Sequence, residues 1–145
     1  DSISVERGNP NAPAPGANDK ATGVAALIEV ARIMSQRQPR ATVIFVAFGA
    51  EEINRLGSIA FVNNYIVGNN IDVYGMINMD IIGSSTGPNG ATVDDRIRMF
   101  SAAPNESGSR NLARAINLIA LRLIPMMSIT VEATGDREGR YSDHL

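Results

Sequence analysis

The sequence predicts an α/β domain built on a mainly parallel sheet. Segments with apolar residues at helical spacing alternate along the chain with short runs of β-branched and aromatic residues. Two of these runs, residues 42–48 and 73–82, are apolar without alternation, which is typical of strands buried on both faces. The 145 residues are 44% hydrophobic, so we expect a single domain with its own core.

The first helix is expected from Ala21 onward, because apolar residues recur there every three or four positions. These residues are Val24, Leu27, Ile28, Ala31 and Met34. Asp19 and Thr22 are both suitable N-cap residues for this helix. A second helix is expected after Gly49, in the region between the two apolar runs, and it extends to about Val67.

The last third of the chain predicts a strand, a helix and a second strand. The first strand is expected at residues 96–100 and the long helix at residues 107–123. A short strand at residues 127–131 follows the helix. Residues 83–90 and 133–145 are rich in polar and turn-forming residues and are expected to be loops.

The composition excludes several classes of function. The chain has no cysteine, which excludes disulfides, thiolate zinc sites, iron–sulfur clusters and a cysteine nucleophile. Its single histidine, His144, excludes the HExxH zinc motif, which needs two. A net charge of −2 does not predict a basic face, so we expect no nucleic-acid partner. No apolar run approaches the roughly 18 residues that span a bilayer.

Ionisable residues lie where α/β domains bind ligands, outside the carboxyl ends of the strands. Glu51 and Glu52 follow the first buried run, and Asp80 belongs to the end of the second. Asp19 precedes the first helix, and His144 follows the last strand. Each has a structural alternative: the glutamates suit a helix N-terminus, Asp19 suits a cap, and His144 suits the surface. Asp80 lies among apolar residues, where a carboxylate is costly unless it is paired or binds a cation.

Taken together, these side chains predict a metal site. Four carboxylates and one imidazole form a ligand set that suits zinc or another divalent ion. Two ions about 3.5–4 Å apart could share one carboxylate and activate a water molecule between them. Glu51 and Glu52 are consecutive, so their side chains point in different directions. One of them could bind metal while the other acts as the general base.

Four blocks of the sequence resemble the zinc aminopeptidases of the aminopeptidase Y and bacterial leucyl aminopeptidase type, the metallopeptidase family numbered twenty-eight. The blocks are APGANDKATGV at residues 14–24, VAFGAEE at 46–52, NMDIIG at 78–83 and YSDH at 141–144. The resemblance implies a three-layer α/β/α fold with a mixed, mainly parallel central sheet. It also implies that residues 1–145 are part of a single catalytic domain, incomplete at both ends. The N-terminal strands, the first histidine ligand and a C-terminal helix are the parts expected to be missing.

The resemblance also implies a role for each candidate residue. Asp19 would bridge two zinc ions, and Asp80 would complete one of the two sites. Glu52 and His144 would complete the other site. Glu51 would be the general acid and base that deprotonates the bridging water and then protonates the leaving amine. Asp1 would orient, from outside the ligand set, a histidine that precedes it in the family.

Two stretches depart from the pattern of the family. Lys20 stands where the family commonly has Asn or Asp, and its charge beside Asp19 is expected to weaken metal binding. Residues 53–55, Ile-Asn-Arg, replace a stretch that is usually rich in Gly and Leu. Tyr141 is a candidate oxyanion donor, with a packed or exposed tyrosine as the alternative. Because one ligand is missing, we expect partial metal occupancy and little activity from these 145 residues alone.

The implied function is a metal-dependent aminopeptidase with two zinc ions, acting on peptides with a free N-terminus. Most relatives of this type are secreted or belong to the cell envelope, so a similar location is expected. The main alternative is a serine hydrolase, because residues 83–87 match G-x-S-x-G with Ser85, His144 and either Asp136 or Asp143 in the order of an α/β-hydrolase. A glutaminyl cyclase-like enzyme and a non-catalytic relative of the same fold are two further candidates.

Overall fold

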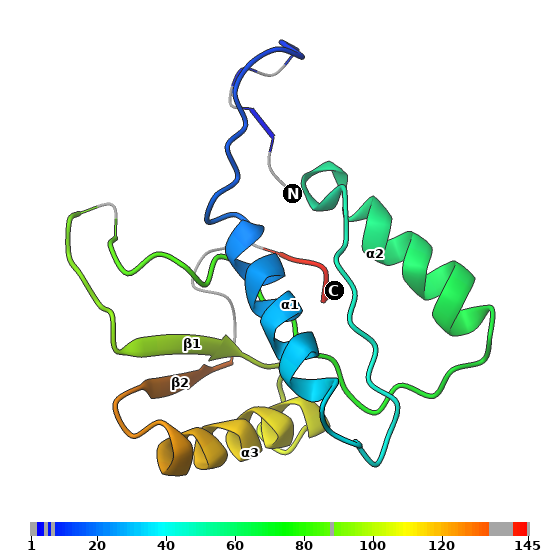
Figure 1. Ribbon diagram of the computed structural model, residues 1–145, viewed down its shortest axis with the longest axis vertical. Coiled ribbons are helices and arrows are strands. Elements are labelled where there is room, and N and C mark those ends of the chain that lie inside the picture. The colour runs from blue at the N-terminus through cyan, green and yellow to red at the C-terminus, as the bar shows by residue number, and fades with distance from the viewer. Residues whose placement is uncertain (1–2, 5, 7, 88, 134–140, 145) are drawn as a thin grey trace. The chain divides into compact units, whose positions relative to one another are not determined.

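The computed structural model describes residues 3–4, 6, 8–87, 89–133 and 141–144. The chain divides into two compact units, each of which is considered by itself (Figure 1). Unit 1 comprises Asp1–Gly83 with Ser142–Leu145, and unit 2 comprises Ser84–Tyr141. All of the candidate metal ligands belong to unit 1.

The first helix of unit 1 confirms the sequence prediction in extent but not in its cap. It is α1 (Ala21–Met34), and its N-cap residue is Lys20, which makes no side-chain capping bond. Asp19 is therefore not the N-cap, and Thr22 lies inside the helix. The Thr22 hydroxyl instead donates to the backbone carbonyl of Asn18 at 2.8 Å. The capping alternative for Asp19 is thus removed, which leaves its carboxylate available for another role.

The second helical segment also lies where the sequence predicts it, but the structure divides it into three pieces. These pieces are the 3₁₀-helix η1 (Glu51–Ile53), α2 (Leu56–Phe61) and the π-helical η2 (Val62–Val67). Asn54 and Arg55 separate η1 from α2, because both have left-handed backbone angles, with φ of 69° and 57°. The Phe61 ring packs on Tyr65, with 5.1 Å between the ring centroids.

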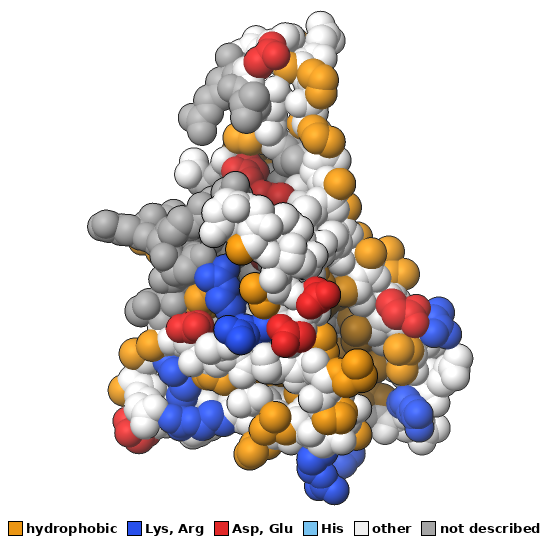
Figure 2. Space-filling model, turned by 90° about the vertical axis from the view of Figure 1, so that its left-hand side faces the viewer, with side chains coloured by type: hydrophobic (Ala, Val, Ile, Leu, Met, Phe, Trp, Pro, Cys, Tyr) orange, Lys and Arg blue, Asp and Glu red, His pale blue; other side chains and the backbone are white. Residues whose placement is uncertain are grey.

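The two apolar runs are not strands, so this part of the prediction is wrong for the described residues. Residues 42–48 and 73–82 have no strand assignment, and neither run is paired in a sheet. A strand needs a neighbour to bond its backbone groups and cover its side chains. Most of the side chains in the two runs are accordingly exposed, with Ile77 at 64% and Val43 at 43%. Figure 2 shows hydrophobic side chains at the surface between charged ones.

Unit 2 contains the predicted strand–helix–strand unit. Its elements are β1 (Arg96–Phe100), α3 (Gly108–Leu123) and β2 (Ser128–Glu132). The two strands pair in parallel from Arg96 opposite Ser128 to Phe100 opposite Glu132, and they lie side by side in Figure 1. Parallel pairing is the arrangement that a helical crossover connection allows. The α/β class is therefore supported, while the three-layer arrangement stays a prediction.

The described residues around Ser85 do not form the strand–turn–helix arrangement that the serine-hydrolase alternative requires. Ser85 lies in a loop whose two sides approach each other, because the amide of Val93 donates to the Ser85 carbonyl at 2.8 Å. Thr86 and Thr92 form an isolated antiparallel bridge in the same loop. A nucleophile elbow needs a helix directly after the serine, and the described residues that follow Ser85 form none before α3. Asp136, one proposed triad member, lies outside the described residues.

In the part of the chain that the structure describes, no helix combines the length and the apolar character needed to cross a bilayer.

Candidate metal centre

Asp80 has one carboxylate oxygen held in place and the other buried without a partner. Its Oδ2 accepts a hydrogen bond from the Ser142 hydroxyl at 2.7 Å. The Ser142 oxygen in turn accepts from the amide Nδ2 of Asn78, also at 2.7 Å. Oδ1 of Asp80 is buried and has no hydrogen-bond partner among the described residues. Burying such an oxygen is costly unless a cation or donor satisfies it, so its position favours a cation ligand.

Lys20 and Asp143 form a buried ion pair next to two of the candidate ligands. The Lys20 ammonium donates to Oδ2 of Asp143, and the two side chains are only 8% and 1% exposed. Lys20 directly follows Asp19, and Asp143 directly precedes His144, which is itself exposed. The contact thereby joins the start of α1 to the C-terminal segment of unit 1, and both lie together in Figure 1.

A tight turn presents the Glu51–Glu52 pair. Ala50, just before the pair, has a left-handed φ of 62°, which carries strain for a residue with a side chain. The amide of Leu56 donates back to the Ala50 carbonyl at 3.1 Å and closes the turn. Glu51 is thereby half-buried and Glu52 is exposed. The turn explains how two consecutive glutamates acquire different environments.

The pKa of the Glu51 carboxyl is raised above its ordinary value, mainly by burial. The positive charge of Lys20 opposes this shift, while the negative charges of Glu52, Asp143 and Asp80 add to it. These four groups therefore lie close enough to Glu51 to act on its charge. The structure thus brings together, in one acidic neighbourhood, residues that are separated by more than 90 positions in the sequence. A raised pKa suits a carboxylate that must accept and release a proton.

Close backbone approach at Gly23 places the beginning of α1 against the Asp80 segment. A Cβ atom added at Gly23 would lie 2.2 Å from the backbone oxygen of Met79, the residue before Asp80. Only glycine permits this contact. The amide of Gly83 also donates to Oδ1 of Asn18, the residue before Asp19, at 2.9 Å. Contacts before and after each aspartate in the sequence therefore hold the segment of Asp19 against the segment of Asp80.

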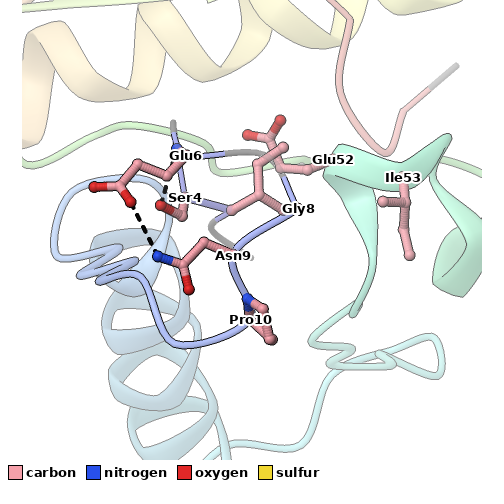
Figure 3. Close-up of a pocket in the computed structure, with 8 residues that line it drawn as sticks. Ser4, Glu6, Gly8, Asn9, Pro10, Glu52 and Ile53 are labelled. Carbon is pink, nitrogen blue, oxygen red and sulfur yellow. Dashed lines mark hydrogen bonds between the residues drawn. The ribbon is translucent and has the colours of Figure 1, made fainter.

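A cavity of about 460 Å³ opens beside Glu52. Its lining comes from the N-terminal loop and from η1, and comprises Ile3, Ser4, Glu6, Gly8, Asn9, Pro10, Glu52 and Ile53. Figure 3 shows the Glu6 side chain turned toward Asn9, whose amide Nδ2 donates to Oε2 of Glu6 at 3.0 Å. The cavity thus combines apolar walls with two carboxylates.

The structure does not assemble a complete ligand cage from the described residues. No group of three or more acidic or histidine side chains among them lies close enough together to hold a metal ion. Asp1 lies outside the described residues, so its orienting role stays a prediction. Tyr141 is 62% exposed, and its oxyanion role also stays a prediction. Zinc nevertheless fits the donors present, because these are carboxylates and an imidazole and one buried oxygen of Asp80 has no partner among the described residues.

The contacts of Ser142 and Asp143 do not follow from the sequence. The sequence predicts Asp143 only as a triad member, and Lys20 only as a charge that opposes metal binding. The sequence does contain one signal for Lys20 and Asp143, namely their position: Lys20 follows Asp19, and Asp143 precedes His144. Their mutual contact could not be inferred, because 123 positions separate the two residues.

The family model described as Peptidase family M28 matches residues 1–122 of the chain. The chain belongs to this family. The match ends before the segment with Ser142, Asp143 and His144. It covers the Asp19, Glu51–Glu52 and Asp80 blocks, which are three of the four blocks that carried the resemblance.

Curated fungal relatives of this M28 chain are named probable zinc metalloproteases. One from Leptosphaeria maculans is 34% identical over 149 residues, covering 90% of this chain and 34% of the relative. One from Pyricularia oryzae is 35% identical over 155 residues, covering 94% of this chain and 31% of the relative. The chain thus spans about a third of the length of the curated relatives it matches. No solved structure shows a significant match.

Gly23→Ala is expected to damage the site of this M28 chain without touching any candidate ligand. The added methyl group would meet the Met79 backbone, so α1 and the Asp80 segment must move apart. We expect the free energy of unfolding to fall by about 1–3 kcal/mol, as for other overpacked positions, and zinc affinity to fall with it. Denaturant unfolding and zinc titration measure the two effects. Gly108→Ala is the control, because an added Cβ at this glycine of α3 would meet no heavy atom within 4 Å. A Gly23→Ala variant that binds zinc normally would contradict the expectation.

Proposed function

We propose that the intact protein is a zinc-dependent peptidase that removes N-terminal residues from peptides and uses two zinc ions. The observation that carries the proposal is the buried Oδ1 of Asp80, which has no partner among the described residues, while Ser142 fixes the other oxygen. Membership of the M28 family and the names of the fungal relatives support the same reaction class. When bound, zinc would activate a water molecule and polarise the scissile carbonyl.

The candidate ligands have distinct places in this proposal. Asp19 would be shared by the two ions, because it lies at the start of α1, packed against the Asp80 segment. Asp80 would complete one site, and Glu52 with His144 would complete the other. The exposure of Glu52 and His144 leaves both side chains free to turn toward an ion.

Glu51 would act as the general base and then as the general acid. It would take a proton from the attacking water and return that proton to the leaving amine. Its half-buried position and raised pKa support this role over that of a ligand. Glu52 is the more exposed of the two glutamates and is better placed to reach a metal ion.

The cavity beside Glu52 is the proposed place for the N-terminal residue of the substrate. Its volume of about 460 Å³ lies within the usual range of small-ligand sites. Ile3, Pro10 and Ile53 offer apolar contacts to a side chain. The carboxylate of Glu6, at the wall of the cavity, supplies the negative charge that a free α-ammonium group needs.

We also propose that the protein is secreted or belongs to the cell envelope. The sequence supports this with an N-glycosylation sequon, Asn105-Glu106-Ser107, in which Asn105 is exposed.

A chelation experiment tests the reaction class. The intact protein is assayed on an amino-acid amide of p-nitroaniline with a free α-amine, before and after dialysis against 1,10-phenanthroline. We expect chelation to abolish hydrolysis and added zinc to restore it. The N-acetylated substrate is the matched control, and it should not be cleaved by an aminopeptidase. Inactivation by a serine-directed phosphonate, with no effect of chelation, would instead support the Ser85 hydrolase.

A further inference from the structure

We propose that Lys20 is a positioning residue, which holds Asp143 and thereby fixes the His144 segment beside Asp19. The role of His144 and Asp19 as zinc ligands is taken from the proposed function, on which this inference rests. The contact itself is a feature of the structure, since the Lys20 ammonium donates to Oδ2 of Asp143. The sequence led us to expect that Lys20 would weaken metal binding, and the pairing points to the opposite.

The position of the pair in the chain supports this role. Consecutive Cα atoms are about 3.8 Å apart, so a residue fixed in space also restrains its neighbour. Lys20 is the neighbour of Asp19, and Asp143 is the neighbour of His144. One ion pair therefore couples two candidate ligands that are 125 positions apart in sequence.

The burial of the pair makes the attachment strong. With side chains 8% and 1% exposed, the two charges attract each other strongly, because little water screens them. The other carboxylate oxygen of Asp143, Oδ1, is buried without a partner among the described residues. Lys20 therefore compensates the charge of Asp143, and losing it would leave a buried carboxylate uncompensated.

Ser142 supplies the second attachment of the same segment. Its hydroxyl bonds Asp80, while Asp143, the next residue, bonds Lys20. The two attachments lead to different parts of unit 1, the Asp80 segment and the start of α1. A segment held at two consecutive residues has little freedom to rotate, so the His144 backbone beside it is fixed in relation to both Asp19 and Asp80.

The test uses near-isosteric neutral variants of the chain, namely Lys20→Met, Asp143→Asn and the double variant. Each single variant should lower the denaturation midpoint, because it leaves one buried charge without its partner. The double variant should recover stability, since it leaves neither charge. We expect zinc affinity to stay about 10- to 100-fold low in all three, the usual effect of losing an outer-shell partner, because no neutral pair holds the segment as firmly. If the ion pair served stability alone, the double variant would recover zinc affinity as well as stability.

A metal-free measurement separates this inference from the proposed function. His144 is the only histidine among these 145 residues. In the intact protein labelled with ¹³C-histidine, the ring signal that the His144→Gln variant lacks is the His144 signal. In the double variant we expect this signal to move to the random-coil position and to sharpen, while the dispersed amide proton signals of the folded protein persist. If the intact wild-type protein bound no zinc, the proposed function would fail, but the His144 signal would still decide on the positioning role.

The control is the exposed ion pair between Glu29 and Arg32 on α1, whose side chains are 54% and 61% exposed. The variants Glu29→Gln and Arg32→Met remove equal charges from a solvated pair and should change neither zinc affinity nor the His144 signal. Two results would overturn the proposal. One is a Lys20→Met variant that binds zinc as tightly as the wild type or more tightly, and the other is an unchanged His144 signal in the double variant.

Discussion

Glu51→Ala is expected to lower kcat of the intact protein by about 10²- to 10⁴-fold, the usual contribution of a general acid or base. The side chain that would take the proton from the attacking water is then absent. Zinc content should stay the same, because Glu52, and not Glu51, is the proposed ligand. Steady-state kinetics measures kcat, and elemental analysis of the purified variant measures bound zinc. The pairing of a large kinetic effect with unchanged metal is what identifies a base.

The comparison with Glu52→Ala makes this result decisive. That variant removes a carboxylate from the same turn, and we expect it to lose zinc as well as activity. Glu106→Ala, an exposed acid of unit 2, controls for the general effect of removing a negative charge. If Glu51→Ala lost zinc while Glu52→Ala kept it, the two roles would have to be exchanged.

Asp80→Asn is expected to have opposite effects on zinc binding and on stability. Zinc affinity should fall by more than the roughly 10- to 100-fold that loss of an outer-shell partner costs, because a proposed ligand charge is removed. The metal-free chain should become more stable, since a neutral amide replaces a charged carboxylate whose buried Oδ1 has no partner among the described residues. Zinc titration and denaturant unfolding in the presence of chelator measure the two quantities.

Asp72→Asn is the matched control, because Asp72 is an exposed aspartate that precedes the same apolar run. It should alter neither quantity by a measurable amount. A less stable metal-free Asp80→Asn variant would show that the Asp80 charge is satisfied in the protein. The unpartnered oxygen of Asp80 would then no longer indicate a cation site.

The elements that the sequence predicted well are those whose pattern is local. The apolar stripe of α1 and the extent of α3 follow from neighbouring residues alone. The two apolar runs were predicted as strands because their composition favours extended, buried chain. Composition cannot supply a pairing partner, and the described residues offer these runs none. A strand makes its backbone hydrogen bonds to a second segment, whereas a helix makes them within one segment.

In the candidate site, the acidic residues were predicted from the sequence, but the contacts between distant residues were not. The acids were predicted because each lies at the end of an element, where α/β domains bind ligands. The charges of Asp80 and Glu52 act on Glu51, but the runs beside these acids are not strands, so their placement at strand ends stays a prediction. The contacts of Ser142 and Asp143 were not predicted, because hydrogen bonds over 62 and 123 positions leave no periodic trace in a sequence.

Gly23 has a consequence for how this protein would behave in a mutational survey. It carries no functional group, yet the Met79 backbone leaves no room for even a methyl group at this position. Every substitution there would disturb the spacing of Asp19 and Asp80, so the position should tolerate variation as poorly as Glu51. A survey that ranked residues by intolerance alone would score Gly23 beside the chemically active acids. Only a measurement of turnover per folded, zinc-loaded molecule would separate the residue that sets the spacing from the residue that moves the proton.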